Sequence, residues 1–213
     1  MKTSLKTLLT SALTAVVLSS SAFTSMAANK DHHVSVLSPE IDFNKVIVTG
    51  NVRVELVQAD KQQVIIYEDY NKATTTVKQK GDKLFINSKE AEPINIVIYV
   101  KDLQRIDASN TVSVITRGRF SSNVLQVFLK DRARVFVNGE IGSLYTIVKD
   151  NSELKLRGSS KDHVSVKGKV AKLKTEQFAA LKTTNSSVEG DLLVQEYAID
   201  RLRDTVIAER LIK

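Results

Sequence analysis

Two aspartates at matching positions of a repeated segment are the residues best placed for chemistry. Asp131 and Asp150 are 19 residues apart, and each begins an alternating stretch that ends in glycine. If the two stretches stack as neighbouring strands, the carboxylates lie about 4.8 Å apart. Carboxylates that close can share a proton or bind Ca²⁺. Stacked carboxylates of this kind would suit the cleavage of a polysaccharide.

The neighbours of these aspartates favour a structural role instead. Lys130, Arg132 and Lys149 lie directly beside them and would repel a cation. Aspartate and asparagine also accept left-handed backbone angles and cap local amides, which makes them good turn residues. We therefore expect the two aspartates, together with Asn110 at the same position of the first repeat, to form turns.

The three histidines suggest neither a metal site nor a catalytic base. His32 and His33 are adjacent, so in an extended chain they point in opposite directions, and we place them with Asp31 in a polar tail. His163 follows Lys161-Asp162 and is expected in a loop. The chain has no cysteine and no Gly-x-Ser-x-Gly turn. We expect no catalytic residue, no metal and no cofactor, so the chain is predicted not to be an enzyme.

Four cations are expected on the outer face of the repeats, namely Arg117, Arg134, Lys155 and Arg157. Repeat arrays present extended surfaces, and such cations could meet an anionic ligand, although ordinary solvation is the alternative. The formal net charge is +7, which falls to +5 without residues 1–27 because that segment contains two lysines and no acid. The basic residues are interspersed with acids, so we do not expect nucleic acid as a partner.

The elements that position these residues recur at an interval of about 20 residues. Residues 109–118, 130–139 and 149–158 align on their closing glycines, which are 21 and 19 residues apart. Such a period is typical of a β-solenoid, in which successive coils stack. The alignment predicts two inward columns and an outward column, with the glycines at one corner. The inward columns are Val114, Val135, Leu154 and Thr116, Val137, Leu156; the outward column is Ser113, Arg134, Glu153; the corner glycines are Gly118, Gly139, Gly158.

Alternation with period two extends over most of the chain from Phe43 onward and predicts strands. The expected strands include 46–48, 52–56, 64–67, 74–77, 84–87 and 94–100, with a hairpin turn at 80–82. We predict an all-β fold, a right-handed parallel β-helix with coils of about 20 residues. An antiparallel β-sandwich is the alternative, because it also produces many short strands separated by turns.

The N-terminus is typical of a secretory signal peptide. Lys2 and Lys6 precede an uncharged run from Leu8 to Phe23, and small residues surround a cleavage position after Ala27. The run is less apolar than the roughly 20 residues that a membrane span requires. We expect a signal peptide at residues 1–27, a flexible lead-in at 28–40 and the β-domain at 41–213. The mature chain would be exported, without a transmembrane segment, to the periplasm, the outer cell surface or the medium.

The segment from Phe43 to Gln58 resembles the opening of the GIN domain, also called DUF2807. The likeness continues through 63–66, 81–86 and 96–106 and then to the C-terminus. The family usually has Ser-Gly-Ser-like corners where this chain has residues 131–133 and 150–152. The resemblance implies a parallel β-helix-like fold, a cell-envelope location and a role as an adhesin head, and it provides no catalytic residues.

These features together predict an exported, non-enzymatic cell-envelope protein with an adhesin-like surface interaction. Its partners would be glycans or proteins of the envelope. The alternative function is a carbohydrate-binding or carbohydrate-active protein acting on an anionic polysaccharide. An unpaired solenoid end invites association, and the charged segment 200–210 is expected to protect that end. The oligomeric state is left open.

Overall fold

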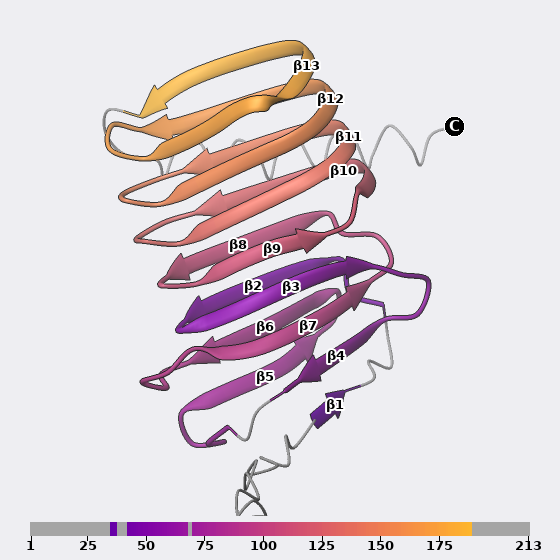
Figure 1. The fold of residues 1–213 in the computed structure, drawn as a ribbon, viewed down its shortest axis with the longest axis vertical. Coiled ribbons are helices and arrows are strands. Elements are labelled where there is room, and N and C mark those ends of the chain that lie inside the picture. Colours follow the sequence, from indigo (N-terminus) through magenta and orange to yellow (C-terminus); the bar gives the residue numbers. More distant parts are fainter. Residues whose placement is uncertain (1–34, 38–41, 68–69, 189–213) are drawn as a thin grey trace, which may run out of the picture. The chain divides into compact units, whose positions relative to one another are not determined.

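The computed structural model describes residues 35–37, 42–67 and 70–188. Within these residues every regular element is a strand, and thirteen strands form one sheet, which confirms the all-β class (Figure 1). The strands are β1 (Ser35–Leu37), β2 (Lys45–Gly50), β3 (Val52–Gln58), β4 (Gln63–Ile66), β5 (Thr75–Lys80), β6 (Lys83–Ser88), β7 (Ile94–Val100), β8 (Arg105–Asn110), β9 (Ser113–Arg117), β10 (Phe120–Leu129), β11 (Arg134–Val148), β12 (Glu153–Gly168) and β13 (Lys172–Val188).

Inter-residue contacts divide the chain into Met1–Asp31 and His32–Lys213, and all described residues belong to the second unit. The predicted signal peptide, His32, His33 and the charged segment 200–210 lie outside the described residues. Within the described part of the chain, no helix has the length and apolar character needed to cross a membrane.

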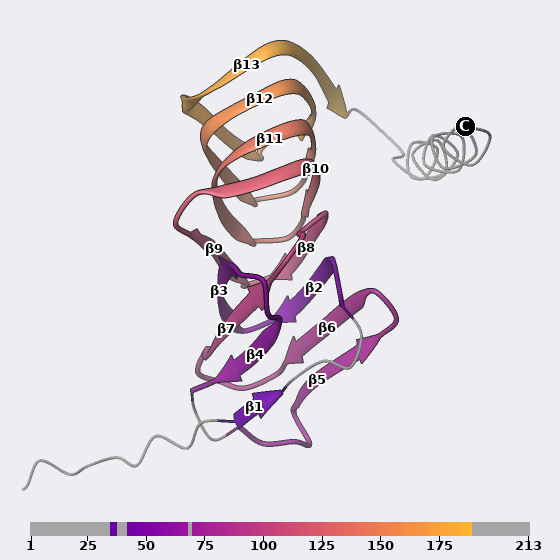
Figure 2. The same ribbon diagram turned by 90° about the vertical axis from the view of Figure 1, so that its right-hand side faces the viewer.

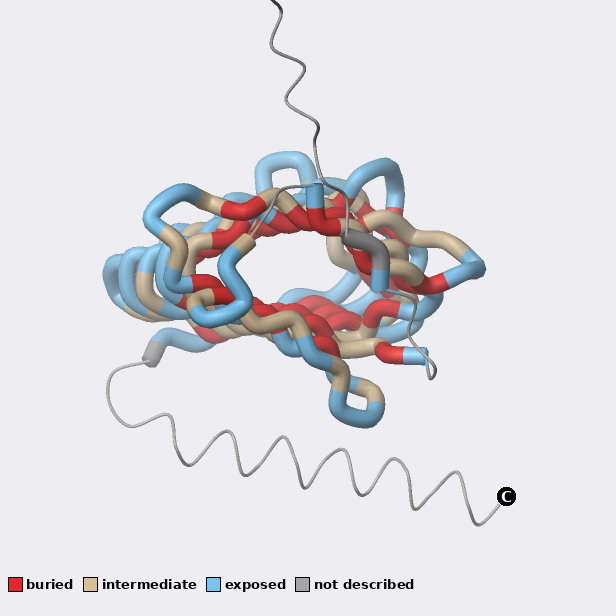
Figure 3. Tube along the Cα trace, turned by 90° about the horizontal axis from the view of Figure 1, so that it is seen from below, coloured by how far each residue is buried: buried red, intermediate tan, exposed pale blue. Residues whose placement is uncertain are grey.

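The sheet curls so that two walls of strands face each other (Figures 2 and 3). The first wall contains β7, β3, β9 and the first halves of β11, β12 and β13. The second wall contains β6, β2, β8, β10 and the second halves of the same three long strands. Buried residues occupy the inner sides of both walls, because alternate side chains of each strand point inward.

The long strands stack in parallel with a regular offset. Arg134 of β11 faces Glu153 of β12, and Gly139 faces Gly158. Strand β9 pairs in parallel with β11 in the predicted register. The three residues of the first inward column, Val114, Val135 and Leu154, are 0%, 3% and 0% exposed. The ladders between these coils are parallel, which is not the pattern of an antiparallel sandwich.

The coils do not follow one another in chain order at the N-terminal end. Strand β2 pairs in parallel with both β6 and β8, and β3 pairs in parallel with both β7 and β9. The coil formed by residues 45–58 therefore lies between two coils that come later in the chain. Figure 1 shows β2 and β3 between the coil of β6 and β7 below and the coil of β8 and β9 above.

Antiparallel pairs form the end of the sheet that contains the first strands. Strand β4 pairs antiparallel with β7 and β1, and β5 forms with β6 the hairpin predicted around Gly81. Strand β1 lies within residues 28–40. Ser35–Leu37 pairs antiparallel with β4, because the edge of β4 offers backbone donors and acceptors to an extended neighbour.

Candidate functional site

The predicted turn residues occupy one corner of the stacked coils. Asn110, Asp131 and Asp150 all have left-handed backbone angles, with φ of 63°, 60° and 53°. The backbone N–H of Asn110 donates to Asp131 Oδ2 at 2.9 Å, and the N–H of Asp131 donates to Asp150 Oδ2 at 2.9 Å. Each carboxylate therefore caps an amide of the preceding coil, which confirms the turn role that the sequence predicts.

His163 lies in a different environment from the loop that its sequence context suggested. It is part of β12, its side chain is 3% exposed, and it points between the walls. Its Nε2 lies 3.1 Å from Thr146 Oγ1, and its ring meets Phe178 edge-on at 5.7 Å. Burial lowers the pKa of His163 because the charged imidazolium loses its hydration. The alternation of the strand, rather than the flanking Lys161-Asp162, determines where this side chain points.

No group of three or more His, Asp or Glu side chains in residues 35–37, 42–67 and 70–188 is arranged as metal ligands would be. The outer faces of the two walls, where side chains meet solvent, are surfaces on which a ligand could bind.

Positive side chains predominate on the outer face of the first wall, which we call the cationic wall. Its cations are Arg53, Arg117, Arg134, Lys155, Arg157, Lys172 and Lys174, and its acids are Glu55, Glu153 and Glu176. The register brings these residues onto one face because each outward position lies beside an outward position of the next coil. All four cations selected from the sequence are exposed and lie on this face.

Two acids of the cationic wall form ion pairs. Arg117 forms an ion pair with Glu55, and Lys174 Nζ lies 2.5 Å from Glu153 Oε1. The hydrogen bond from Lys174 is the main reason that the pKa of Glu153 is lowered. Two of the exposed cations are consequently attached to carboxylates of this same face.

The other two sequence-predicted arginines have no such partner. Among the described residues, neither Arg134 nor Arg157 has a carboxylate oxygen within 4.0 Å. Lys155 extends over the ring of Phe136, with Nζ 5.7 Å from the ring centroid, a contact that leaves its charge available. A guanidinium can bind a carboxylate or sulfate through two parallel hydrogen bonds. Arg134, Lys155 and Arg157 therefore form the part of the wall that is best suited to an anionic ligand.

The cations on the outer face of the second wall are used differently. Lys45 Nζ donates to Asp82 Oδ2 at 2.6 Å, and this bond is the main reason that the pKa of Asp82 is lowered. Arg105 binds Asp107 at 2.9 Å and stacks on Phe128 with its guanidinium carbon 4.2 Å from the ring centroid. Lys45 and Arg105 are therefore each held by a carboxylate, whereas Arg134 and Arg157 of the first wall are not.

A family model described as "Putative auto-transporter adhesin, head GIN domain" (DUF2807) matches residues 42–207. No curated protein matches the chain significantly. Solved structures give a similar picture. A "putative adhesin" from Bacteroides fragilis superposes with a TM-score of 0.60 at 18% identity, over 73% of this chain and 76% of that one.

Two further solved structures share the fold. A "putative adhesin" from Parabacteroides merdae has a TM-score of 0.55 at 14% identity, over 75% of this chain and 78% of its own. A "putative lipid binding protein" from Parabacteroides distasonis has a TM-score of 0.53 at 14% identity, over 73% of this chain and 78% of its own. At these identities the similarity shows a common fold.

Proposed function

Starting from the fact that this chain belongs to the DUF2807 (GIN domain) family, we propose that it is an exported, non-enzymatic protein of the cell envelope with an adhesin-like role. Its contact surface is the cationic wall, and its ligand is an anionic polysaccharide. The curled sheet that presents this wall is a right-handed parallel β-helix. The signal-peptide pattern of residues 1–27 supports export.

The observation that carries the proposal is that Arg134 and Arg157, on an exposed parallel ladder, form no ion pair with a carboxylate of the described residues, although the charge of Arg134 contributes to the lowered pKa of Glu153. Neighbouring strands repeat at about 4.8 Å, and positive charge is present on three successive strands, with Arg134 on β11, Lys155 and Arg157 on β12, and Lys172 and Lys174 on β13. A linear polyanion presents its own charges at regular intervals and could contact several coils at once. Each exposed charge pair contributes roughly 0.2–1 kcal/mol, so affinity would arise from several contacts together and would fall with salt.

The alternative of a carbohydrate-active protein has less support. Catalysis would require the carboxylates of Asp131 and Asp150 to act as a pair. Each carboxylate instead accepts a hydrogen bond from a backbone N–H group at the corner. Binding without catalysis is the simpler use of the cationic wall.

The proposal can be tested with residues 28–213 and a triple variant, Arg134→Gln, Lys155→Gln and Arg157→Gln. We expect the unmodified protein to bind immobilised polygalacturonate and heparin more strongly than neutral dextran, and more weakly as NaCl increases. The triple variant should bind about tenfold more weakly, because three contacts of about 0.5 kcal/mol each are lost. Surface plasmon resonance measures both effects.

A matched control changes three exposed lysines away from the cationic wall, Lys78→Gln, Lys80→Gln and Lys161→Gln. It removes the same net charge, so a nonspecific charge effect would weaken both variants equally, and that result would contradict the proposal. Anionic phospholipid vesicles form a separate arm. Binding to vesicles with none to the two polysaccharides would reject the polysaccharide as the ligand.

A further inference from the structure

The last strand of the sheet has an edge without a strand partner among the described residues. β13 is 17 residues long and pairs only with β12 (Figure 1). Most of its residues are exposed, and Leu181 is 89% exposed. A long bare edge presents unpaired N–H and C=O groups to any strand that can reach them. The edge strands at the other end of the sheet, β1 and β5, are only 3 and 6 residues long.

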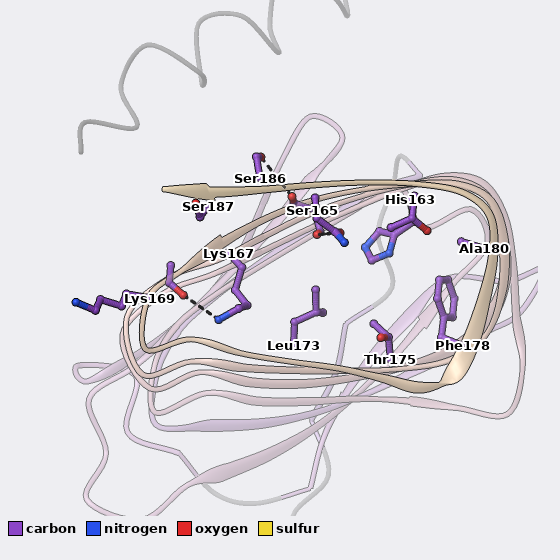
Figure 4. Close-up of a pocket in the computed structure, with 13 residues that line it drawn as sticks. His163, Ser165, Lys167, Lys169, Leu173, Thr175, Phe178, Ala180, Ser186 and Ser187 are labelled. Carbon is purple, nitrogen blue, oxygen red and sulfur yellow. Dashed lines mark hydrogen bonds between the residues drawn. The ribbon is translucent and has the colours of Figure 1, made fainter. Parts of the chain in front are cut away.

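A cavity of about 570 Å³ opens between the walls at this same end (Figure 4). Leu173 and Phe178 of β13 contribute apolar surface to it, and His163, Ser165 and Lys167 of β12 contribute polar groups. The inward positions of the second wall become polar toward this end of the stack. For example, Leu125 and Leu144 are followed in their column by His163 and Thr183.

We propose that the edge of β13 and this cavity are the docking surface for residues 191–207 of this same chain, which add to the sheet as its next coil. The chain continues directly from the end of β13 at Val188, so no long connection is needed. The family match also extends past β13 to residue 207, which is one coil length further. This inference does not depend on the ligand of the cationic wall.

The sequence repeats across this boundary with the offset that joins β11 to β12. Arg134 faces Glu153 at an offset of 19, and the same offset aligns β13 with residues 191–207. Several aligned pairs are identical or chemically similar. They are Leu173 with Leu192, Phe178 with Tyr197, Ala179 with Ala198, Lys182 with Arg201, Asn185 with Asp204, and Ser186 with Thr205.

Residues 191–207 have apolar side chains at most of the cavity-lining positions where β13 has polar ones. The cavity-lining positions of β13 are Leu173, Thr175, Phe178, Ala180, Thr183, Asn185, Ser186 and Ser187. Their counterparts are Leu192, Val194, Tyr197, Ile199, Leu202, Asp204, Thr205 and Val206, of which all but Asp204 and Thr205 are largely apolar. The intervening positions, such as Gln195, Glu196 and Arg203, are mostly polar, as the wet side of a strand requires.

A second copy of the chain is a weaker occupant of this surface. Its own β13 would bring mostly Thr, Asn and Ser side chains to the cavity, together with a single leucine and a single phenylalanine, Leu173 and Phe178. Residues 191–207 instead provide leucine, isoleucine and tyrosine. They are also attached to the same chain, so their effective concentration at the edge is high.

Adjacent leucines provide the first test in the full chain. In the proposed register Leu192 enters the cavity and Leu193 faces solvent, so Leu192→Asp and Leu193→Asp make the same chemical change on opposite sides. We expect Leu192→Asp to lower Tm by about 5–10 °C and Leu193→Asp to change it little. Equal effects of the two substitutions on Tm, measured by circular dichroism, would overturn the register.

Disulfide trapping tests the pairing itself, because the chain contains no cysteine of its own. Ala179→Cys with Ala198→Cys places the two thiols on facing residues of neighbouring strands, where the separation of about 5 Å permits a disulfide. The control pair, Ala179→Cys with Leu193→Cys, is out of register. We expect an intrachain disulfide in the first pair only, seen by non-reducing electrophoresis and intact mass. Absence of that bond, equal bonding in both pairs, or a disulfide-linked dimer would overturn the proposal.

Discussion

At the scale of single residues, the corner aspartates connect coils that are distant in sequence. Asp131 adopts the left-handed angle of its own turn while its carboxylate accepts the N–H of Asn110, 21 residues earlier. Its residue type and position in the repeat are sufficient to predict the turn. The origin of the capped amide could not be predicted in the same way, because it depends on which coil becomes the neighbour.

Substitution of Asp131 should show the combined contribution of its turn angle and its amide cap to stability. We expect Asp131→Ala to destabilise the protein by about 1–2 kcal/mol, because alanine loses the acceptor and tolerates the left-handed angle poorly. Asp131→Asn should cost less than about 0.5 kcal/mol, since asparagine keeps both properties. Urea unfolding followed by circular dichroism gives both values, and the prediction fails if the two variants are equally stable.

His163 shows that local context can mislead about a single side chain. The preceding Lys161-Asp162 suggested a loop, but the register places His163 beside Leu144, an inward position. Alignment at the 19-residue offset was the signal that could have located it. Its hydrogen bond to Thr146 could not be found from the sequence without that register.

The burial of His163 predicts a pH dependence of stability. The pKa of His163 is lowered in the folded protein, so the unfolded chain binds its proton first as pH falls below about 6.5. The stability associated with the neutral ring is therefore fully present above pH 6.5 and is lost as pH falls. We expect Tm of the unmodified protein to fall more between pH 7.5 and 5 than that of His163→Gln. Parallel Tm curves would contradict the prediction.

At the scale of elements, the register of the long strands brings backbones into close contact at one corner. Gly158 has φ of 107°, and a Cβ added there would lie 2.0 Å from the carbonyl oxygen of Gly139 on the neighbouring strand. The closing glycines that defined the repeat in the sequence therefore include a position where two coils touch. Gly118, at the same predicted corner, has φ of 77° but no atom within 4 Å of an added Cβ.

Because Gly158 touches the neighbouring strand and Gly118 does not, substitution of each glycine by alanine gives a matched comparison. Gly158→Ala should destabilise the protein by about 3 kcal/mol or more, because the methyl group would force β11 and β12 apart in addition to straining the backbone. Gly118→Ala should cost only the backbone strain, about 1–2 kcal/mol. Chemical denaturation of both variants provides the comparison, and a larger loss in Gly118→Ala would show that coil contact is not the dominant effect.

At the scale of the sheet as a whole, the two walls and the two ends have different properties. Cations of the first wall include Arg134 and Arg157, which have no carboxylate partner among the described residues, whereas Lys45 and Arg105 of the second wall are paired. One end of the sheet has short antiparallel strands, and the other has the long edge of β13. The proposed ligand surface and the proposed docking of residues 191–207 follow from these two asymmetries.

The sequence by itself determined the strand class, the coil period, the corner at Asp131 and the inward column through Val135. These features depend on the alternation of side chains along a strand and on local turn preferences, which a single segment contains. Only the tertiary structure decided that β2 and β3 lie between later coils, that β1 joins β4, and that Arg117 is paired while Arg134 is not. Each of these depends on which strands become neighbours, and pairing between distant segments follows from the packing of the whole sheet rather than from any local pattern.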